Sequence, residues 1–112
     1  MTVKEKLLSI INALEDKLAR DVEAIDIHEI SLLADYFVIA SAGSSSQMNA
    51  LVDAVEEAGA KEHFSVRKPE GNYQSGWSLL DCGDVVVHLF SEEQRGFYDL
   101  EHIWKDGKKV EF

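Results

Sequence analysis

The sequence contains a single cysteine and no long apolar run, and both absences limit where the chain can work. Cys82 has no second thiol with which to form a disulfide, so folding does not require an oxidising compartment. No stretch approaches the ~20 apolar residues of a membrane-spanning helix. Residues 1–10 lack the long apolar run and the cleavage site of a signal peptide. We therefore expect a cytoplasmic protein with no membrane partner.

Basic residues are also scarce. Lys and Arg number 11 against 21 Asp and Glu, which gives a formal net charge of −10. Proteins that bind nucleic acid through its phosphates normally present a basic stripe, whereas cations here gather only at 67–68 and 105–109. Extensive direct nucleic-acid binding is therefore not expected. The acidic charge would steer the chain toward a basic partner, although it would equally serve solubility alone.

Length and composition indicate one globular domain. A chain of 112 residues matches a single core, which commonly occupies roughly 100 to 150 residues. Hydrophobic residues make up 46% and charged residues 29%, as in ordinary soluble proteins. We find no internal repeat, linker or low-complexity segment. The sequence therefore predicts a single domain over 1–112.

Two helices are predicted in the first half of the chain. Thr2 and Glu5 have the spacing of a capping box, and apolar residues then recur every three or four positions as far as Leu18. The turn 42–46 is rich in helix-capping residues and precedes a second apolar stripe. This second helix is expected to end near Gly59.

A third helix is predicted near the C-terminus. Residues 91–94 repeat the capping-box spacing and open a helix whose apolar side carries Phe97, Leu100 and Trp104. The spacing of Trp104 with the other two favours a place in the core over a partner contact. Residues 105–112 are expected to be a polar tail.

Strands are predicted between these helices. Residues 22–27 alternate weakly, whereas 36–40 form a continuous apolar run that suits a central strand covered on both faces. A short strand is expected at 64–67, followed by a turn-forming cluster at 69–72. A β-hairpin is expected from 77–90. The order αββαβββα predicts an α/β domain with a mixed β-sheet flanked by helices.

The hairpin 77–90 offers a candidate recognition surface. We expect strands 77–81 and 84–90 to flank a loop at Cys82-Gly83, with Asp81 opposite Asp84. Alternation then divides the side chains between two faces. One face carries Trp77, Leu79, Asp81, Asp84, Val86 and His88, and the plainer core face carries Ser78, Leu80, Val85, Val87 and Leu89. The first face suits partner recognition, with an aromatic anchor ringed by polar groups. Alternatively, Trp77 packs under the last helix.

Three groups of residues suggest chemistry, and each has a structural alternative. Gly43-Ser44 precedes a helix and is a candidate anion cradle, although a Gly-Ser turn commonly caps helices. Asp81 and Asp84 are candidate magnesium ligands for nucleotidyl transfer, but Asp is also favoured in hairpin loops. His88 is a candidate general base or a structural histidine. The four histidines show no metal-ligand spacing with each other or with the cysteine, and the serines lack a nearby activating base.

Two long motifs resemble a known family. Residues 34–39 read ADYFVI and are followed by Ser41, Ser44 and Gln47. The second motif comprises Glu70, Gly71, Trp77, Leu80, Asp81, Gly83, Asp84, Val85, Val86, Val87, His88, Phe90, Arg95, Phe97, Tyr98, Leu100, Glu101 and Trp104. Together they resemble the ribosomal silencing factor family, also called the Iojap family, over nearly the whole chain. Two ordered motifs at matching separation make chance similarity improbable.

The resemblance implies a nucleotidyltransferase-like mixed sheet that works by binding, with neither enzymatic activity nor a cofactor. It implies repression of translation: the protein binds the large ribosomal subunit through ribosomal protein uL14 and sterically blocks joining of the small subunit. It also implies self-association as a homodimer. The partner-binding residues expected by resemblance are Gly71, Tyr73, Trp77, Leu79, Asp81, Asp84, Tyr98 and Glu101.

The chain departs from the family pattern at two places. Ser46 stands where many members carry Arg, which weakens any anion or partner contact carried over to that position. The segment 59–70 is shorter than in many members and includes His63 and Phe64. Two other hypotheses stay open: a metal-dependent nucleotidyltransferase that uses the Asp81 and Asp84 pair, and a homodimeric scaffold that self-associates through the hairpin.

Overall fold

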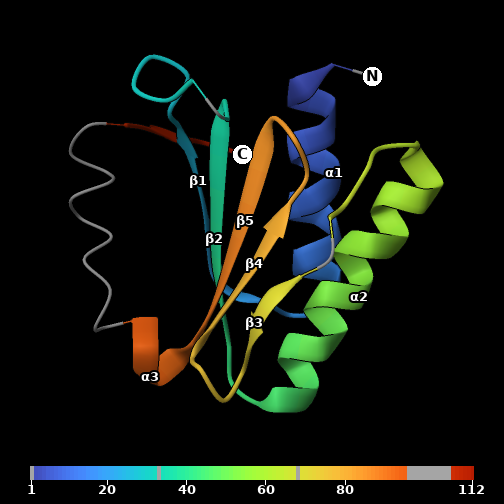
Figure 1. The fold of residues 1–112 in the computed structure, drawn as a ribbon, viewed down its shortest axis with the longest axis vertical. Coiled ribbons are helices and arrows are strands. Elements are labelled where there is room, and N and C mark those ends of the chain that lie inside the picture. The colour runs from blue at the N-terminus through green and yellow to red at the C-terminus, as the bar shows by residue number, and fades with distance from the viewer. Residues whose placement is uncertain (1, 33, 68, 96–106) are drawn as a thin grey trace.

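A computed structural model describes residues 2–32, 34–67, 69–95 and 107–112, and its ribbon is drawn in Figure 1. Within these ranges the chain forms helices and strands in the order αββαβββαβ. The elements are α1 (Val3–Asp16), β1 (Arg20–Asp26), β2 (Tyr36–Ala42), α2 (Ser45–Glu62), β3 (Glu70–Asn72), β4 (Trp77–Asp81), β5 (Val85–Ser91), α3 (Glu92–Arg95) and β6 (Lys108–Val110). None of the helices in the described part of the chain is long and apolar enough to cross a membrane.

The strands form one six-stranded sheet in the order β3-β4-β5-β2-β1-β6. Strand β2 runs parallel to β5, and the other neighbouring pairs are antiparallel. The predicted mixed sheet is therefore confirmed, and so is the central place of the apolar run in β2. Five consecutive residues of this strand, Val38 to Ala42, are buried. Strands lie on both sides of β2, and other parts of the chain pack over both of its faces.

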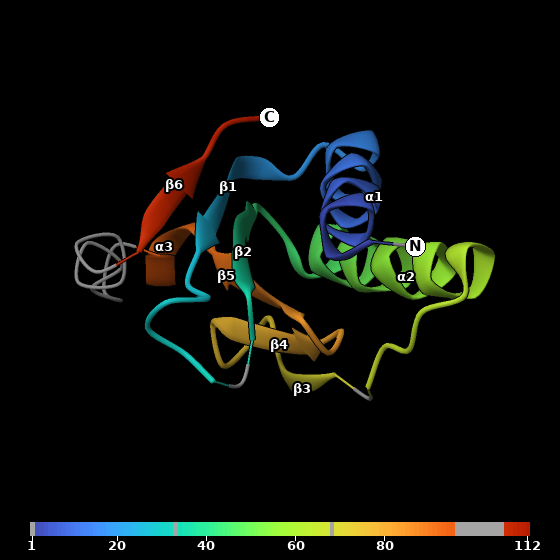
Figure 2. The same ribbon diagram turned by 90° about the horizontal axis from the view of Figure 1, so that it is seen from above.

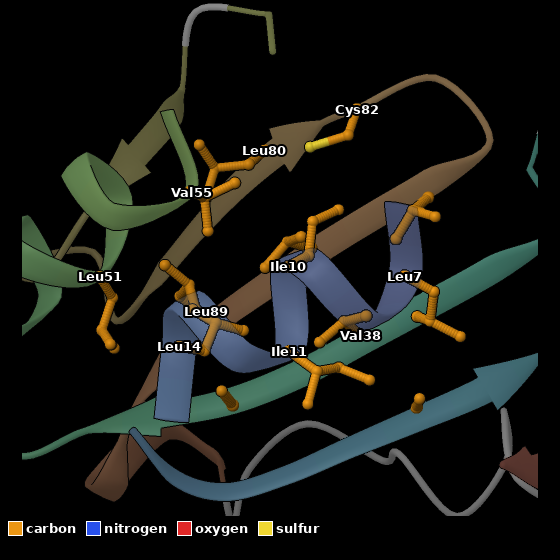
Figure 3. Packing of buried hydrophobic residues seen from close by; sticks show 14 of the residues in the cluster. Leu7, Ile10, Ile11, Leu14, Val38, Leu51, Val55, Leu80, Cys82 and Leu89 are labelled. Atoms are coloured by element: carbon orange, nitrogen blue, oxygen red, sulfur yellow. The ribbon is translucent and has the colours of Figure 1, made fainter. Parts of the chain in front are cut away.

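Helices α1 and α2 lie side by side on one face of the sheet, as Figure 2 shows from above. The main core fills the space between these helices and the sheet, and Figure 3 shows its side chains from close by. The fully covered members include Leu7, Ile10, Ile11, Leu14, Leu51, Val55, Leu80 and Leu89. A second, smaller apolar cluster lies on the opposite face of the sheet and is described below.

Helix α1 begins as its capping residues predict. The Thr2 hydroxyl oxygen accepts a hydrogen bond of 3.1 Å from the Glu5 amide, which satisfies one of the free amides at the helix start. The helix ends at Asp16, and Leu18 then adopts a left-handed conformation with φ of 61°. The backbone can therefore turn sharply into β1.

Helix α2 extends three residues beyond the end expected at Gly59. It stops at Glu62, where His63 adopts the left-handed conformation that terminates many helices. Gly59 has a different role, because a Cβ atom there would lie 2.8 Å from both the Phe64 carbonyl oxygen and a Val66 methyl carbon. The glycine lets the returning chain pass close to the helix.

The expected strand at 64–67 is wrong, and a strand forms instead at β3, inside the segment expected to be a turn. Phe64 and Val66 pack against the main core without pairing in the sheet. Strand β3 is short, exposed and at the edge, so apolar alternation gives little sign of it. It depends on Gly71, whose φ is 80° and whose added Cβ would lie 2.2 Å from the Trp77 carbonyl oxygen.

The predicted polar tail, 105–112, is also corrected. Its residues Lys108–Val110 form β6, which pairs with β1 at the other edge of the sheet. Val110 packs against the main core, and Lys109 lies 3.5 Å from the Glu23 carboxylate. An exposed ion pair thus accompanies the backbone pairing of β6 with β1. The added strand changes the predicted order of elements.

The third helix is confirmed at its first turn. The Ser91 hydroxyl accepts a hydrogen bond of 3.2 Å from the Gln94 amide, as the capping spacing predicts. Helix α3 follows at Glu92–Arg95. Phe97, Leu100 and Trp104, which were expected along its apolar side, lie outside the described residues.

Candidate partner-binding surface

The β4–β5 hairpin turns one residue later than predicted. Cys82 donates its amide to the Val85 carbonyl oxygen at 2.9 Å, so the two-residue loop is Gly83-Asp84 and not Cys82-Gly83. Gly83 has a φ of 84°, which this kind of tight turn requires. Asp81 therefore pairs with Val86, and the predicted pairing with Asp84 is wrong.

The predicted division into two faces survives this correction except for Asp84, which was expected on the face of Trp77 and lies in the loop instead. Moving the centre of the turn by one residue shifts the register by two, and an even shift leaves each side chain on the same side of the sheet. The face toward the helices carries the buried residues Ser78, Leu80, Val85, Val87 and Leu89. The opposite face carries the partly buried residues Trp77, Leu79, Asp81, Val86 and His88. We call these five residues the Trp77 face.

Trp77 packs against the sheet and its loops, while most of the last helix, under which it was alternatively expected to pack, lies outside the described residues. Its ring packs against the second apolar cluster, which consists of Ile25, Ile27, Ala34, Ile39 and Phe90. Phe37 and Val86 flank the same cluster. Trp77 is nevertheless only partly buried, so part of the residue stays accessible at the surface. A tryptophan anchored in this way loses little freedom when a partner covers it, which suits a binding anchor.

His88 is enclosed by aromatic rings on this face. Its ring centroid lies 4.8 Å from that of Phe37, 6.1 Å from that of Trp77 and 6.3 Å from that of Phe90. Burial lowers the pKa of His88 from its usual value of 6.5 to about 4, because the surroundings disfavour the charged ring. The neutral, covered imidazole supports the structural interpretation over a general base.

Asp81 and Asp84 serve the turn and its neighbours. The Asp81 carboxylate accepts a hydrogen bond of 2.8 Å from the Gly83 amide, the local contact for which Asp is favoured in turns. It also lies 3.9 Å from the exposed Arg67 guanidinium, and Asp84 lies 3.9 Å from the Lys6 ammonium. Among the described residues, no group of three or more His, Cys, Asp or Glu side chains could hold a metal ion. The geometry favours the turn interpretation of this pair.

Lys6 is a neighbour of the hairpin that sequence reasoning missed. Its ammonium donates a hydrogen bond of 3.0 Å to the Cys82 carbonyl oxygen and lies 5.7 Å above the Phe64 ring. The lysine belongs to α1, so nothing in the local sequence signals its contact with a turn 76 residues later. It ties the helical layer to the hairpin.

The amides at the Gly43-Ser44 turn are used within the protein. The Gln47 side-chain oxygen accepts a hydrogen bond of 2.7 Å from the Gly43 amide, and the Ser44 hydroxyl accepts one of 3.1 Å from the Gln47 amide. The Gln47 amide group in turn donates to the Leu18 carbonyl oxygen at 2.8 Å. These contacts favour a helix cap that joins two turns over an anion cradle.

The remaining expected contact residues fall in different places. Gly71 is exposed on the edge strand β3, opposite Ser78 and close to the Trp77 carbonyl oxygen. Tyr73 packs against the main core, and thus on the helix side of the sheet. Tyr98 and Glu101 lie outside the described residues. The structure therefore brings Trp77, Leu79 and Asp81 together on one face, while Asp84 sits at the nearby turn.

Comparison with known proteins identifies the family. The family model described as ribosomal silencing factor during starvation matches residues 1–112. This chain belongs to the ribosomal silencing factor family. It is 37% identical to the silencing factor of Halalkalibacterium halodurans over 111 residues, which covers 99% of this chain and 95% of that protein. It is 40% identical to the silencing factor of Bacillus subtilis over 94 residues, or 84% of this chain and 80% of that protein.

Solved structures of similar chains agree with the fold. A crystal structure from Bacillus halodurans has a TM-score of 0.84 and 35% identity, and the match covers 97% of this chain and 99% of that one. A crystal structure of a Chromobacterium violaceum protein has a TM-score of 0.87 and 31% identity over 100% of this chain and 92% of that one. The family resemblance predicted from the two motifs is thus confirmed.

Proposed function

We propose that this protein represses translation by binding ribosomal protein uL14 on the large ribosomal subunit through the Trp77 face. The bound protein occupies the surface that the small subunit must approach, so the two subunits cannot join. Repression then needs neither bond-making chemistry nor a cofactor. The observation that carries the proposal is Trp77, anchored in the second apolar cluster yet only partly buried, on the side of the sheet away from α1 and α2.

The composition of the Trp77 face supports binding to a protein. Tryptophan is among the residues most enriched at the energetic centres of protein interfaces, where surrounding groups exclude water. Leu79 and Val86 extend the apolar area beside it, and the Asp81 carboxylate stands at the edge near the turn. An apolar centre with a charged rim is the usual anatomy of an interface.

The charge of the chain supports a basic partner. A net charge of −10 would attract a positively charged ribosomal protein and would repel ribosomal RNA. Binding should therefore depend on a protein surface and weaken as salt screens the attraction. The same charge disfavours the nucleotidyltransferase alternative, because it provides little to hold a triphosphate.

Co-sedimentation with purified large subunits tests the surface. The wild-type protein should pellet with the subunits at low salt, and the double variant Trp77→Ala, Asp81→Lys should stay in the supernatant. Leu8→Ala is the matched control, because Leu8 is 45% exposed on α1, on the other side of the sheet. Binding by the double variant that equals the wild type would show that the site lies elsewhere.

A subunit-joining assay tests the mechanism. Adding the wild-type protein to large subunits before small subunits should reduce the amount of joined ribosomes in a sucrose gradient, and the double variant should not. Purified uL14 added in excess should restore joining by competing for the Trp77 face. Normal joining in the presence of bound wild-type protein would contradict steric blocking.

We also propose that the free protein forms a homodimer. Light scattering of the protein alone should give twice the mass of one chain. Repeating the measurement with uL14 present distinguishes two arrangements: a fall to a one-to-one complex means that the dimer uses the Trp77 face, and a larger assembly means that it uses another. A mass equal to one chain at all concentrations would exclude the dimer.

A further inference from the structure

His88 is a polar side chain placed in the apolar cluster on the Trp77 face. Its neighbours there include Phe37 and Phe90, and its Nε2 atom is buried with no hydrogen-bond partner among the described residues. A buried polar atom without a partner lowers stability. As far as this atom is concerned, an apolar residue of similar size would therefore make the fold more stable than the imidazole does.

The imidazole holds the Trp77 indole. The Trp77 Nε1 atom lies 3.3 Å from His88 Nδ1, and the planes of the two rings are 16° apart. An indole nitrogen can only donate, so His88 Nδ1 accepts and the proton of the neutral imidazole resides on Nε2. The contact thus determines the histidine tautomer and restrains rotation of the tryptophan ring.

Orientation of the indole matters for what a partner meets. A free indole N–H must find an acceptor when a partner covers it, because an unpaired buried donor weakens binding. Here the donor is already paired inside the protein. A partner can therefore cover the exposed part of Trp77 with apolar groups alone.

We infer that His88 is a positioning residue for the proposed binding surface. It accepts the Trp77 N–H so that the indole stays in one orientation and is presented to the partner as an apolar surface. The partner then contributes an apolar side chain over the ring, with no hydrogen-bond acceptor for the indole nitrogen. This inference rests on the proposed function, since it concerns the same face.

Two variants of His88 separate the hydrogen bond from the packing. His88→Asn keeps an oxygen acceptor near the position of Nδ1, whereas His88→Leu has a similar size and no acceptor. Leu removes the unpartnered Nε2–H but also the acceptor of the Trp77 N–H, so the two effects offset and this variant should resist denaturation about as well as the wild type. If His88 had only a structural role, His88→Leu should be clearly less stable than the wild type.

The indole N–H signal reports the contact directly. In a Trp104→Phe background, Trp77 supplies the single indole N–H of the chain, which contains two tryptophans. Its nitrogen-hydrogen NMR signal should move and exchange faster with water in His88→Leu, and it should stay near the wild-type position in His88→Asn. An unchanged signal in His88→Leu would overturn the inference.

A double-mutant cycle on large-subunit binding tests the consequence. His88→Leu should weaken binding by about threefold to tenfold, the usual range for one net hydrogen bond. The same substitution in a Trp77→Phe chain should have little effect, because phenylalanine has no N–H to orient. His88→Asn should restore most of the binding lost in His88→Leu.

The outcomes distinguish the inference from the proposed function. If Trp77→Ala leaves binding unchanged, the Trp77 face is not the contact surface, and both fail. If Trp77→Ala weakens binding but His88→Leu and Trp77→Phe have additive effects on binding, the inference about His88 fails and the proposed function stands. Coupling between the two positions together with rescue by Asn supports both.

Discussion

The two faces of the sheet are built from alternating residues of the same strands, yet they are covered to different extents. On the helix side of the hairpin, Leu80, Val87 and Leu89 are completely buried beneath α1 and α2. On the other side, Trp77 and Val86 stay partly exposed over a smaller apolar cluster. Under the proposed function, stability and recognition fall to opposite faces, one residue apart in sequence.

The difference also concerns where polar groups are placed. On the helix side, Ser78 is buried but its hydroxyl donates to the Glu70 carbonyl oxygen at 3.3 Å. On the Trp77 face, the buried Nε2 of His88 has no hydrogen-bond partner in the part of the chain that the structure describes. Proteins tolerate such local costs mainly where function requires them, which supports the proposed binding site on the second face.

Leu80 and Leu79 provide the largest contrast between the faces. Leu80→Ala should lower the free energy of unfolding by about 3 to 4 kcal/mol, because it removes a completely buried side chain and leaves a cavity. Leu79→Ala should cost only about 1 kcal/mol, since Leu79 is partly exposed, but it should weaken subunit binding. Urea denaturation and co-sedimentation measure the two effects. Equal losses of stability would show that both faces are core.

Acid should act on the Trp77 face before it acts on the helix side. The pKa of His88 is lowered to about 4 in the folded chain from 6.5, so the unfolded chain binds the proton more readily. The contribution of the neutral imidazole to the free energy of unfolding is fully present above pH 6.5 and is lost as the pH falls toward 4. The expected loss between pH 7 and pH 5 is about 2 kcal/mol.

His88→Leu is the control for this titration. Asp26 raises the pKa of the exposed His28, and carboxylates also titrate at low pH, but both contribute to the wild type and to the variant alike. The difference in unfolding free energy between the two proteins should therefore grow as the pH falls. A difference that is constant from pH 7 to pH 5 would mean that His88 is not buried in the folded protein.

Sequence patterns predicted those parts of the fold where the local signal is strong. The capping box at Thr2, the apolar run of β2 and the two faces of the hairpin are all confirmed. Strands β3 and β6 were missed because each has three residues at an edge and depends on its pairing partner for order. Short polar segments carry no periodicity from which such pairing could be inferred.

The candidate site was predictable in composition but not in its contacts. Alternation placed Trp77 and His88 on one face, and an error of two residues in register did not alter that result. The hydrogen bond between their rings depends on that register and on ring rotation, neither of which the sequence specifies. The contact of Lys6 with the turn depends on how α1 packs, so it too required the structure.

Substitutions at Gly71 and Gly83 test whether the backbone conformation at these glycines supports the Trp77 face. Both have positive φ, so alanine at either position introduces strain of about 1 kcal/mol. At Gly83 an added Cβ would have no neighbour nearer than the Lys6 nitrogen at 3.6 Å, whereas at Gly71 it would lie 2.2 Å from the Trp77 carbonyl oxygen. Gly71→Ala should therefore cost about 2 kcal/mol and weaken subunit binding, while Gly83→Ala should affect stability alone. Equal effects on binding would show that β3 does not support Trp77.

Lys6 offers the smallest effect and tests how the helix side is joined to the turn. Lys6→Met keeps the apolar stem but removes the hydrogen bond to the Cys82 carbonyl oxygen, so we expect a loss of about 1 kcal/mol in unfolding free energy. Asp84→Asn removes only the exposed ion pair with the same lysine and should cost about 0 to 0.5 kcal/mol. Thermal unfolding at low and high salt separates the two, because only the ion pair should respond to screening. If Asp84→Asn proves as costly as Lys6→Met, the charge of Asp84 and not the carbonyl contact joins the turn to the helix.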